Sequence, residues 1–180
     1  MKKEMLRKQQ RELLGEIAEL LSAMELMVEL SSKEENGLAD AVIAEHPEVG
    51  DSHTELLGEY YFLPLEAEEM ELQHFVTALT VLDDMEPDSS ERMTEAIAKI
   101  NYMLPEGAFR ISPDGEILSY RYVSVMPADL PHEKMFIRMR KQIASALENT
   151  ALWSDMLLSV DAGTVSFEEF MDFFRQRYHD

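Results

Sequence analysis

The chain has 180 residues, of which 46% are hydrophobic and 29% charged, and this balance excludes a wholly disordered or fibrous protein. It contains no cysteine, which excludes disulfides, thiol catalysis, iron–sulfur clusters and zinc sites built on thiolates. Its formal net charge of −20 repels nucleic acid and anionic membranes, so we expect neither as a partner.

The length is typical of one α+β domain, residues 1–180, in three consecutive parts. These are an N-terminal helix and turn (1–37), strands with a central helix (38–126) and C-terminal helices (127–180). The basic start at residues 2–11 is followed by glutamates at helical intervals, not by the apolar run of a secretory signal. No stretch approaches the roughly 18 apolar residues of a membrane span, so we expect a cytoplasmic protein.

Apolar residues at intervals of three and four predict an amphipathic helix over residues 4–30. The helix should stop within residues 31–37, because Asn36 and Gly37 in this segment favour turns. The apolar stripe of the predicted helix consists of Leu13, Leu14, Ile17, Leu20, Leu21, Met24, Met27 and Val28.

Three short apolar segments follow, at residues 38–45, 56–65 and 71–82. The second and third are rich in aromatic and β-branched residues, which predicts strands. The first stays open between strand and helix, because its alanines suit a helix equally well.

Turn and cap residues organise the second half of the chain. Pro87 to Glu91 predicts a side-chain cap for a helix over 89–104. The turn Ser112-Pro-Asp-Gly115 predicts a hairpin between strands at 108–112 and 116–126. Helical spacing over 131–160, with an interruption near 148–150, and a capping box of Ser166 and Glu169 predict the last two helices.

These elements predict an antiparallel sheet of about five strands packed against helices. Their order is α-β-β-β-α-β-β-α with an extra C-terminal helix.

Residues 163–170 resemble the second half of a calcium-binding EF-hand loop. The loop positions that must supply oxygen ligands hold Leu158, Val160 and Ala162, none of which has a side-chain oxygen. We therefore predict a glycine turn followed by a capped helix, without calcium.

The histidines do not form a recognisable metal motif. Residues 71–74 have the Glu-x-x-His spacing of helical metal sites, but they lie on a predicted strand, and 129–132 is the only near match. No phosphate-binding, dinucleotide-binding, hydrolase or zincin motif is present. We expect no catalytic, cofactor-binding or metal-binding residues, and so no enzyme. The alternative is a metal-assisted enzyme that uses His46, His53, His74 and nearby carboxylates.

Charge and methionine content indicate a protein partner. Residues 12–91 hold 22 acids and one base, Lys33; this acidity either serves solubility or steers a basic partner. The 13 methionines serve core packing or an adaptable binding groove. We therefore predict a noncatalytic module that binds an unidentified protein or peptide, in the manner of a chaperone, through apolar surface rimmed by acid.

The passage Asn101-Tyr-Met-Leu-Pro-Glu-Gly-Ala-Phe109, followed by Arg110 to Tyr120, resembles the YbjN-like family, which is related in fold to type III secretion chaperones. In that family an Asn near the end of the central helix precedes a Gly-x-Phe strand and a hairpin. The resemblance covers about residues 55–162 and implies an antiparallel sheet packed against helices, without an active site. The chaperone relatives are acidic dimers that bind extended segments of effector proteins.

Two apolar stripes raise the question of assembly. The stripe of residues 4–30 and that of the last helix, with Phe167, Phe170, Met171 and Phe174, together exceed what one sheet can cover. This predicts a twofold homodimer. The alternative is a monomer in which both helices fold back on their own sheet.

Overall fold

A computed structural model describes residues 2–33, 39–64 and 71–178. The strands are β1 (Val28–Ser31), β2 (Ala41–Val49), β3 (Thr54–Phe62), β4 (Leu72–Leu82), β5 (Ala108–Ile111) and β6 (Leu118–Pro127). The helices are α1 (Lys3–Ala23), α3 (Ser90–Met103), α4 (His132–Asp161) and α5 (Phe167–Tyr178), with a short 3-10 turn at Pro87–Ser89.

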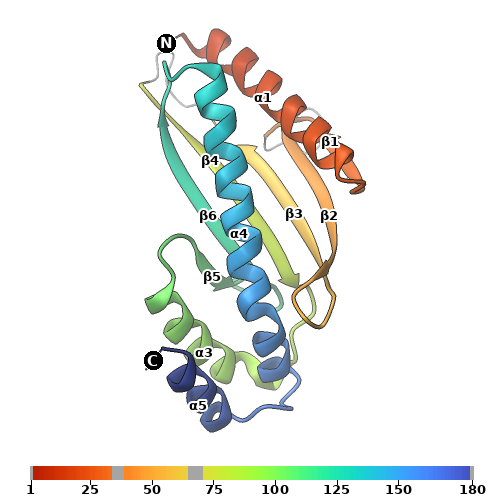
Figure 1. The fold of residues 1–180 in the computed structure, drawn as a ribbon, viewed down its shortest axis with the longest axis vertical. Helices are drawn as coiled ribbons and strands as arrows, with labels where there is room; N and C mark the ends of the chain where they lie inside the picture. The colour runs from red at the N-terminus through yellow and green to blue at the C-terminus, as the bar shows by residue number, and fades with distance from the viewer. Residues whose placement is uncertain (1, 34–38, 65–70, 179–180) are drawn as a thin grey trace.

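The six strands form one antiparallel sheet in the order β1-β2-β3-β4-β6-β5. Figure 1 shows α1 and α4 lying across one face of this sheet, with α3 and α5 gathered at the end opposite to the N-terminus. The predicted α+β fold is therefore confirmed, with six strands in the described residues where about five were expected.

The additional strand is β1, and the prediction of a helix over 4–30 was wrong in its last part. Helix α1 ends at Ala23. Two residues later, Glu25 takes a left-handed φ of 65°. The amides of Glu25 and Leu26 donate to the carbonyls of Ser22 and Leu21, which is the hydrogen-bond pattern of a Schellman motif. This motif turns the chain, so that Val28 begins a strand in place of another helical turn.

The structure tests three further expectations about where elements begin, end and are capped. Residues 41–45, left open between strand and helix, belong to β2. Helix α4 runs through 148–150 without the predicted interruption. The start of α3 has no side-chain cap hydrogen bond, because the hydroxyl of Ser89 bonds to the Asp161 carboxylate instead. Some predictions fall outside the described residues, which omit 34–38 and 65–70. These are most of the turn predicted after the first helix, the start of the segment 38–45 and the end of the segment 56–65.

The hairpin and the last helix follow their sequence signals. Gly115 takes a left-handed φ of 84° in the turn between β5 and β6. Ser166 and Glu169 form the predicted capping box, because the Glu169 amide donates to Ser166 Oγ at 3.2 Å and the Ser166 amide donates to Glu169 Oε2 at 2.8 Å.

The core lies between the sheet and the helix layer. Its largest fully buried side chains are Trp153, Tyr60, Tyr120, Phe75, Phe109 and Phe170. Leu13, Leu14, Ile17 and Leu21 of α1 also belong to this core. These four residues of the predicted stripe therefore pack on their own sheet, whereas Met24 and Met27, which belonged to the same prediction, are 60% and 68% exposed.

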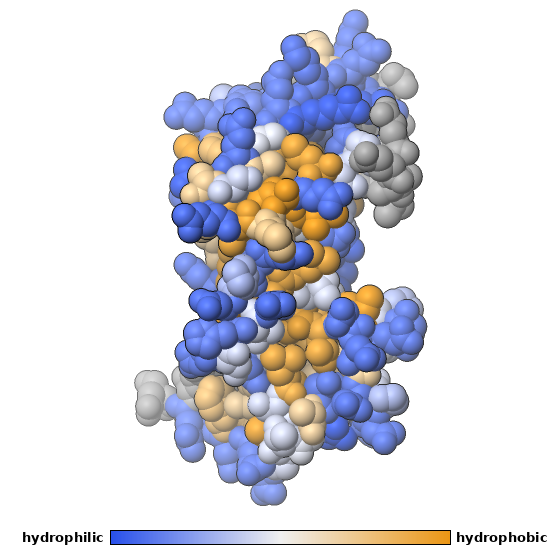
Figure 2. All heavy atoms as spheres, turned by 90° about the vertical axis from the view of Figure 1, so that its right-hand side faces the viewer, coloured by the Kyte–Doolittle hydropathy of each residue, from blue (hydrophilic) through white to orange (hydrophobic). Residues whose placement is uncertain are grey.

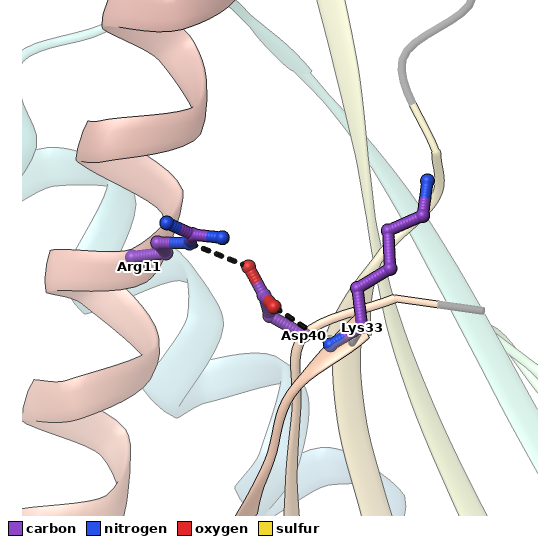
Figure 3. Close-up of polar contacts among 3 residues, drawn as sticks. All are labelled: Arg11, Lys33 and Asp40. Carbon is purple, nitrogen blue, oxygen red and sulfur yellow. Dashed lines mark hydrogen bonds and ion pairs between the residues drawn. The ribbon is translucent and has the colours of Figure 1, made fainter. Parts of the chain in front are cut away.

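A partly exposed ion pair joins α1 to the start of β2 (Figure 3). Asp40 accepts a hydrogen bond from Arg11 Nε at 2.7 Å and another from the Lys33 amide at 2.9 Å. Burial by itself would raise the pKa of Asp40, but these hydrogen bonds and the positive charges of Arg11 and Arg7 hold it below its usual value. The carboxylate therefore stays ionised and holds the helix against the sheet.

Candidate functional site

The two faces of the sheet have different surroundings. On the helix-covered face, Gln142 of α4 donates to the hydroxyl of Thr77, and Gln73 donates to the sulfur of Met135, also on α4. Because successive side chains of a strand point to opposite faces, the neighbours of these strand residues point away from the helices. No described helix covers this second face, which we call the open face.

Large apolar side chains are exposed on the open face. By strand register it carries Met27, Leu57, Leu72, Val123 and Val125, which are between 36% and 68% exposed. At its centre Val76 is fully buried although no described helix lies over it, and its partners on the neighbouring strands are Tyr61 and Val123. These side chains form two groups, Met27 and Leu57 at one end and Leu72, Val123 and Val125 at the other, and exposed apolar groups of this kind mark candidate interaction sites.

The open face contains a hollow of about 590 Å³. One row of its lining crosses three strands, since Glu45 pairs with Leu57 and Leu57 pairs with Thr80. Met27 adjoins this row, because its carbonyl accepts the Glu45 amide. The full lining consists of Glu25, Leu26, Met27, Glu45, His46, Pro47, Glu55, Leu56, Leu57, Thr80, Val81, Leu82 and Asp83.

The hollow combines an apolar lining with a negative rim. Four of its residues are carboxylates, Glu25, Glu45, Glu55 and Asp83, and no lysine or arginine lines it. Figure 2 looks onto the side formed by β1 and β2, where a band of apolar atoms runs lengthwise between hydrophilic flanks. A ligand that fills the hollow therefore needs apolar side chains and positive charge.

Under the hollow lies a buried histidine–tyrosine pair. His46 Nε2 and the Tyr60 hydroxyl are 2.6 Å apart, and both side chains lie on the helix-covered face. Burial lowers the pKa of His46 and raises the pKa of Tyr60, so both groups are neutral near pH 7. Gly58 gives the pair its space, because a Cβ there would lie 2.5 Å from the Tyr60 hydroxyl and 2.9 Å from His46 Nε2.

A second hollow of about 400 Å³ lies beside Asp40. Arg7, Arg11 and Lys33 line it together with apolar residues of α1 and β3. Asp40 already forms the ion pair with Arg11, so part of this positive charge is neutralised within the protein. This hollow is therefore a weaker candidate than the one on the open face.

The histidines of the metal-assisted alternative lie in different surroundings. His46 faces the helix layer and bonds to Tyr60, His74 follows the opposite alternation of β4, and His53 occupies the turn after β2. Within residues 2–33, 39–64 and 71–178, no group of three metal-ligating side chains lies close enough to hold an ion. His132 bonds to Glu16 at 2.7 Å and joins α4 to α1.

The calcium-like segment also has a structural role. Gly163 takes a left-handed φ of 65° between α4 and α5, as the glycine-turn interpretation requires. Asp161, just before it, accepts hydrogen bonds from the Ser89 hydroxyl and the Glu86 amide. This carboxylate therefore anchors the end of α4 to the start of α3.

Sequence reasoning predicted the character of the site but not its residues. The acid and the apolar surface were expected, whereas the row of Glu45, Leu57 and Thr80 was not. These residues come from three strands, and only their register brings them together.

Among the described helices, none has the apolar length that a bilayer crossing requires.

No protein-family model and no curated protein matches the chain. Two similar solved structures are YbjN of E. coli, a proposed transcription regulator, and an uncharacterised protein from Methanothermobacter thermautotrophicus. YbjN is 7% identical, with a TM-score of 0.44 over 79% of this chain and 92% of its own. The second is 14% identical, with a TM-score of 0.40 over 79% of this chain and 97% of its own. The resemblance to the YbjN-like family that the sequence indicated is matched by a structural likeness to YbjN itself.

Proposed function

We propose that the chain is a protein-binding module that takes a basic segment with apolar side chains into the hollow of the open face. The observation that carries this proposal is the apolar hollow rimmed by Glu25, Glu45, Glu55 and Asp83. Apolar contacts supply most of the affinity, and the carboxylates select for positive charge.

The chemistry of the hollow supports binding rather than catalysis. Its hydroxyl and carboxylate groups sit around an apolar surface, and His46, which is part of the lining, is already bonded to Tyr60. A catalytic base needs access to a substrate proton, and His46 is only 5% exposed. No observation favours the metal-assisted alternative, so we do not propose it. The homodimer stays a prediction.

The test uses three synthetic peptides of equal length, in which leucine alternates with lysine, leucine with glutamate, and serine with lysine. We expect the leucine–lysine peptide to bind most tightly in fluorescence anisotropy, because it alone supplies both apolar side chains and positive charge. Its affinity should fall with rising salt, since the rim carboxylates are close to solvent.

A matched pair of variants locates the binding. Leu57 in the hollow and Leu152 on α4 are 43% and 39% exposed, so replacing either with glutamine removes a similar apolar surface. L57Q should weaken binding about tenfold, which corresponds to the loss of part of one leucine's burial. L152Q should leave the affinity unchanged. Equal affinities for L57Q and the natural protein, or equal binding of the serine–lysine peptide, would show that the hollow is not the site.

A further inference from the structure

Strand β6 has a stretch of edge that no strand of the described residues covers. On one side β6 pairs with β4 along residues 118–127, whereas on the other side β5 pairs only with residues 118–121. Figure 1 shows the rest of β6 at the margin of the sheet, beyond the end of β5. Residues 122–126 therefore present a free edge, which we call the β6 edge.

The hydrogen-bond register identifies which backbone groups this edge offers. The Ala128 amide donates to the Glu71 carbonyl, so these residues form a hydrogen-bonded pair of the antiparallel ladder. Because such pairs alternate, the amides and carbonyls of Tyr122, Ser124 and Met126 point toward β4. Those of Val123 and Val125 point away from it.

A side chain from α4 agrees with this alternation. Gln142 Nε2 donates to the carbonyls of both Phe75 and Tyr122, at 3.2 and 3.0 Å. One amide group can reach both oxygens only if both lie between β4 and β6. The Tyr122 carbonyl therefore points toward β4, and the groups of Val123 point outward.

Two other stretches of edge in this sheet, on β5 and on β2 beyond β1, are hindered from pairing, and the β6 edge is not. The outward amide and carbonyl of Phe109 on β5 are bonded by the side chain of Asn101. The part of β2 beyond β1 contains Pro47 and the left-handed Glu48, both of which hinder strand pairing. No described residue bonds to the outward groups of Val123 and Val125, and residues 122–126 include no charge, proline or glycine.

We propose that the β6 edge binds an extended segment of another protein, which adds a strand beside Val123 and Val125. The segment would exchange backbone hydrogen bonds with these two residues and place apolar side chains next to theirs on the open face, where Val125 is 50% exposed. This site goes beyond the hollow of the proposed function, because it lies on another strand and needs no contact with Leu57.

Geometry excludes a twofold copy of β6 centred on Ser124 as the occupant. If β6 paired with its own twofold copy about Ser124, residue 127 of the copy would lie opposite Arg121, where Ala108 of β5 already sits. A separate segment can begin opposite Val123 and leave past the end of β6. Exposed Glu71, Asp129 and Glu133 lie around that end, so a basic residue in the segment finds negative charge there.

Amide hydrogen exchange tests the proposal directly, with the leucine–lysine peptide as probe. In the free protein, the amides of Val123 and Val125 should exchange faster than those of Ser124 and Met126, which are bonded to β4. Saturating peptide should slow exchange at Val123 and Val125 at least tenfold. Unchanged exchange at both residues would overturn the proposal.

A peptide methylated on alternate backbone nitrogens separates strand addition from other binding. It keeps the charge and the side chains, but one side of the peptide strand has no amide hydrogens to donate to β6. The protection from exchange at Val123 and Val125 should therefore be lost with it. If this peptide protects both residues as well as the unmethylated one does, strand addition is wrong. The L57Q variant should retain the protection, so a failure of the hollow proposal and a failure of the edge proposal are distinguishable.

Two variants at one position complete the test. V125P removes an outward amide that β4 does not use, so the ladder between β4 and β6 should survive, and peptide protection at Val123 should fall at least tenfold. V125T keeps the amide and the β-branched shape, and should behave like the natural protein. Should V125P fail to fold, the methylated peptide still decides; a folded V125P with full protection at Val123 would contradict the proposal.

Discussion

The side chain of Asn101 at the end of α3 pairs with the backbone of Phe109 as a neighbouring strand would. Asn101 Nδ2 donates to the Phe109 carbonyl at 2.9 Å, and the Phe109 amide donates to Asn101 Oδ1 at 2.8 Å. The helix residue therefore closes the outer edge of β5. It also gives a physical role to the asparagine that carried the resemblance noted in the sequence.

Replacing Asn101 with alanine should destabilise the fold by about 2–3 kcal/mol, because it leaves two backbone groups of Phe109 unsatisfied. Urea denaturation measures this change. The control is N149A, which removes a single hydrogen bond to the Tyr120 hydroxyl and should cost about 1 kcal/mol. An N101A loss no larger than that of N149A would contradict the strand-like role of Asn101.

Glu25 holds a conformation that favours glycine, at a φ of 65°. Replacing it with glycine should stabilise the protein by about 0.5 kcal/mol, since relief of the left-handed strain exceeds the added entropy of the unfolded chain. E25A removes the same charge without relieving the strain, so it should bring no gain. A lower urea midpoint for E25G than for the natural protein would show that this turn is not strained.

His46 should make folding stability depend on pH. Because burial lowers its pKa in the folded state, the unfolded chain binds the proton first as pH falls below about 6.5. Stability is therefore fully present above that pH and declines below it, by up to about 1.4 kcal/mol per pH unit for one proton. Denaturation at pH 7.5 and 5.5 should show a smaller decline for H46Q than for the natural protein. H53Q serves as the control and should retain the full decline; an equal decline in H46Q would contradict the assignment to His46.

Local signals in the sequence predicted the parts of the fold that depend on local chemistry. The Ser112–Gly115 turn and the Ser166–Glu169 capping box form as expected, because their hydrogen bonds join residues within five positions of one another. The strand β1 was missed for the opposite reason. Met24, Met27 and Val28 satisfy a helical spacing, and only pairing with β2 makes Val28 a strand residue.

Tertiary contacts also explain the continuous helix α4. Asn149 and Thr150 favour an interruption when read locally, because their side chains compete for backbone hydrogen bonds. In the structure Asn149 donates to the Tyr120 hydroxyl, and Thr150 Oγ1 donates to the Ala146 carbonyl within the helix. The open face could not be predicted from the sequence for a related reason. The alternation of side chains along β3 and β4 does not indicate which face of the sheet the helices will cover.

The most direct test of the proposed function is an NMR titration of the natural protein with the leucine–lysine peptide, followed through backbone amide shifts. The account predicts saturable shifts along the row of Glu45, Leu57 and Thr80, with smaller or absent changes on the outer side of α4 around Leu152. Shifts confined to the helix layer, with the row of the hollow unchanged at saturation, would contradict it.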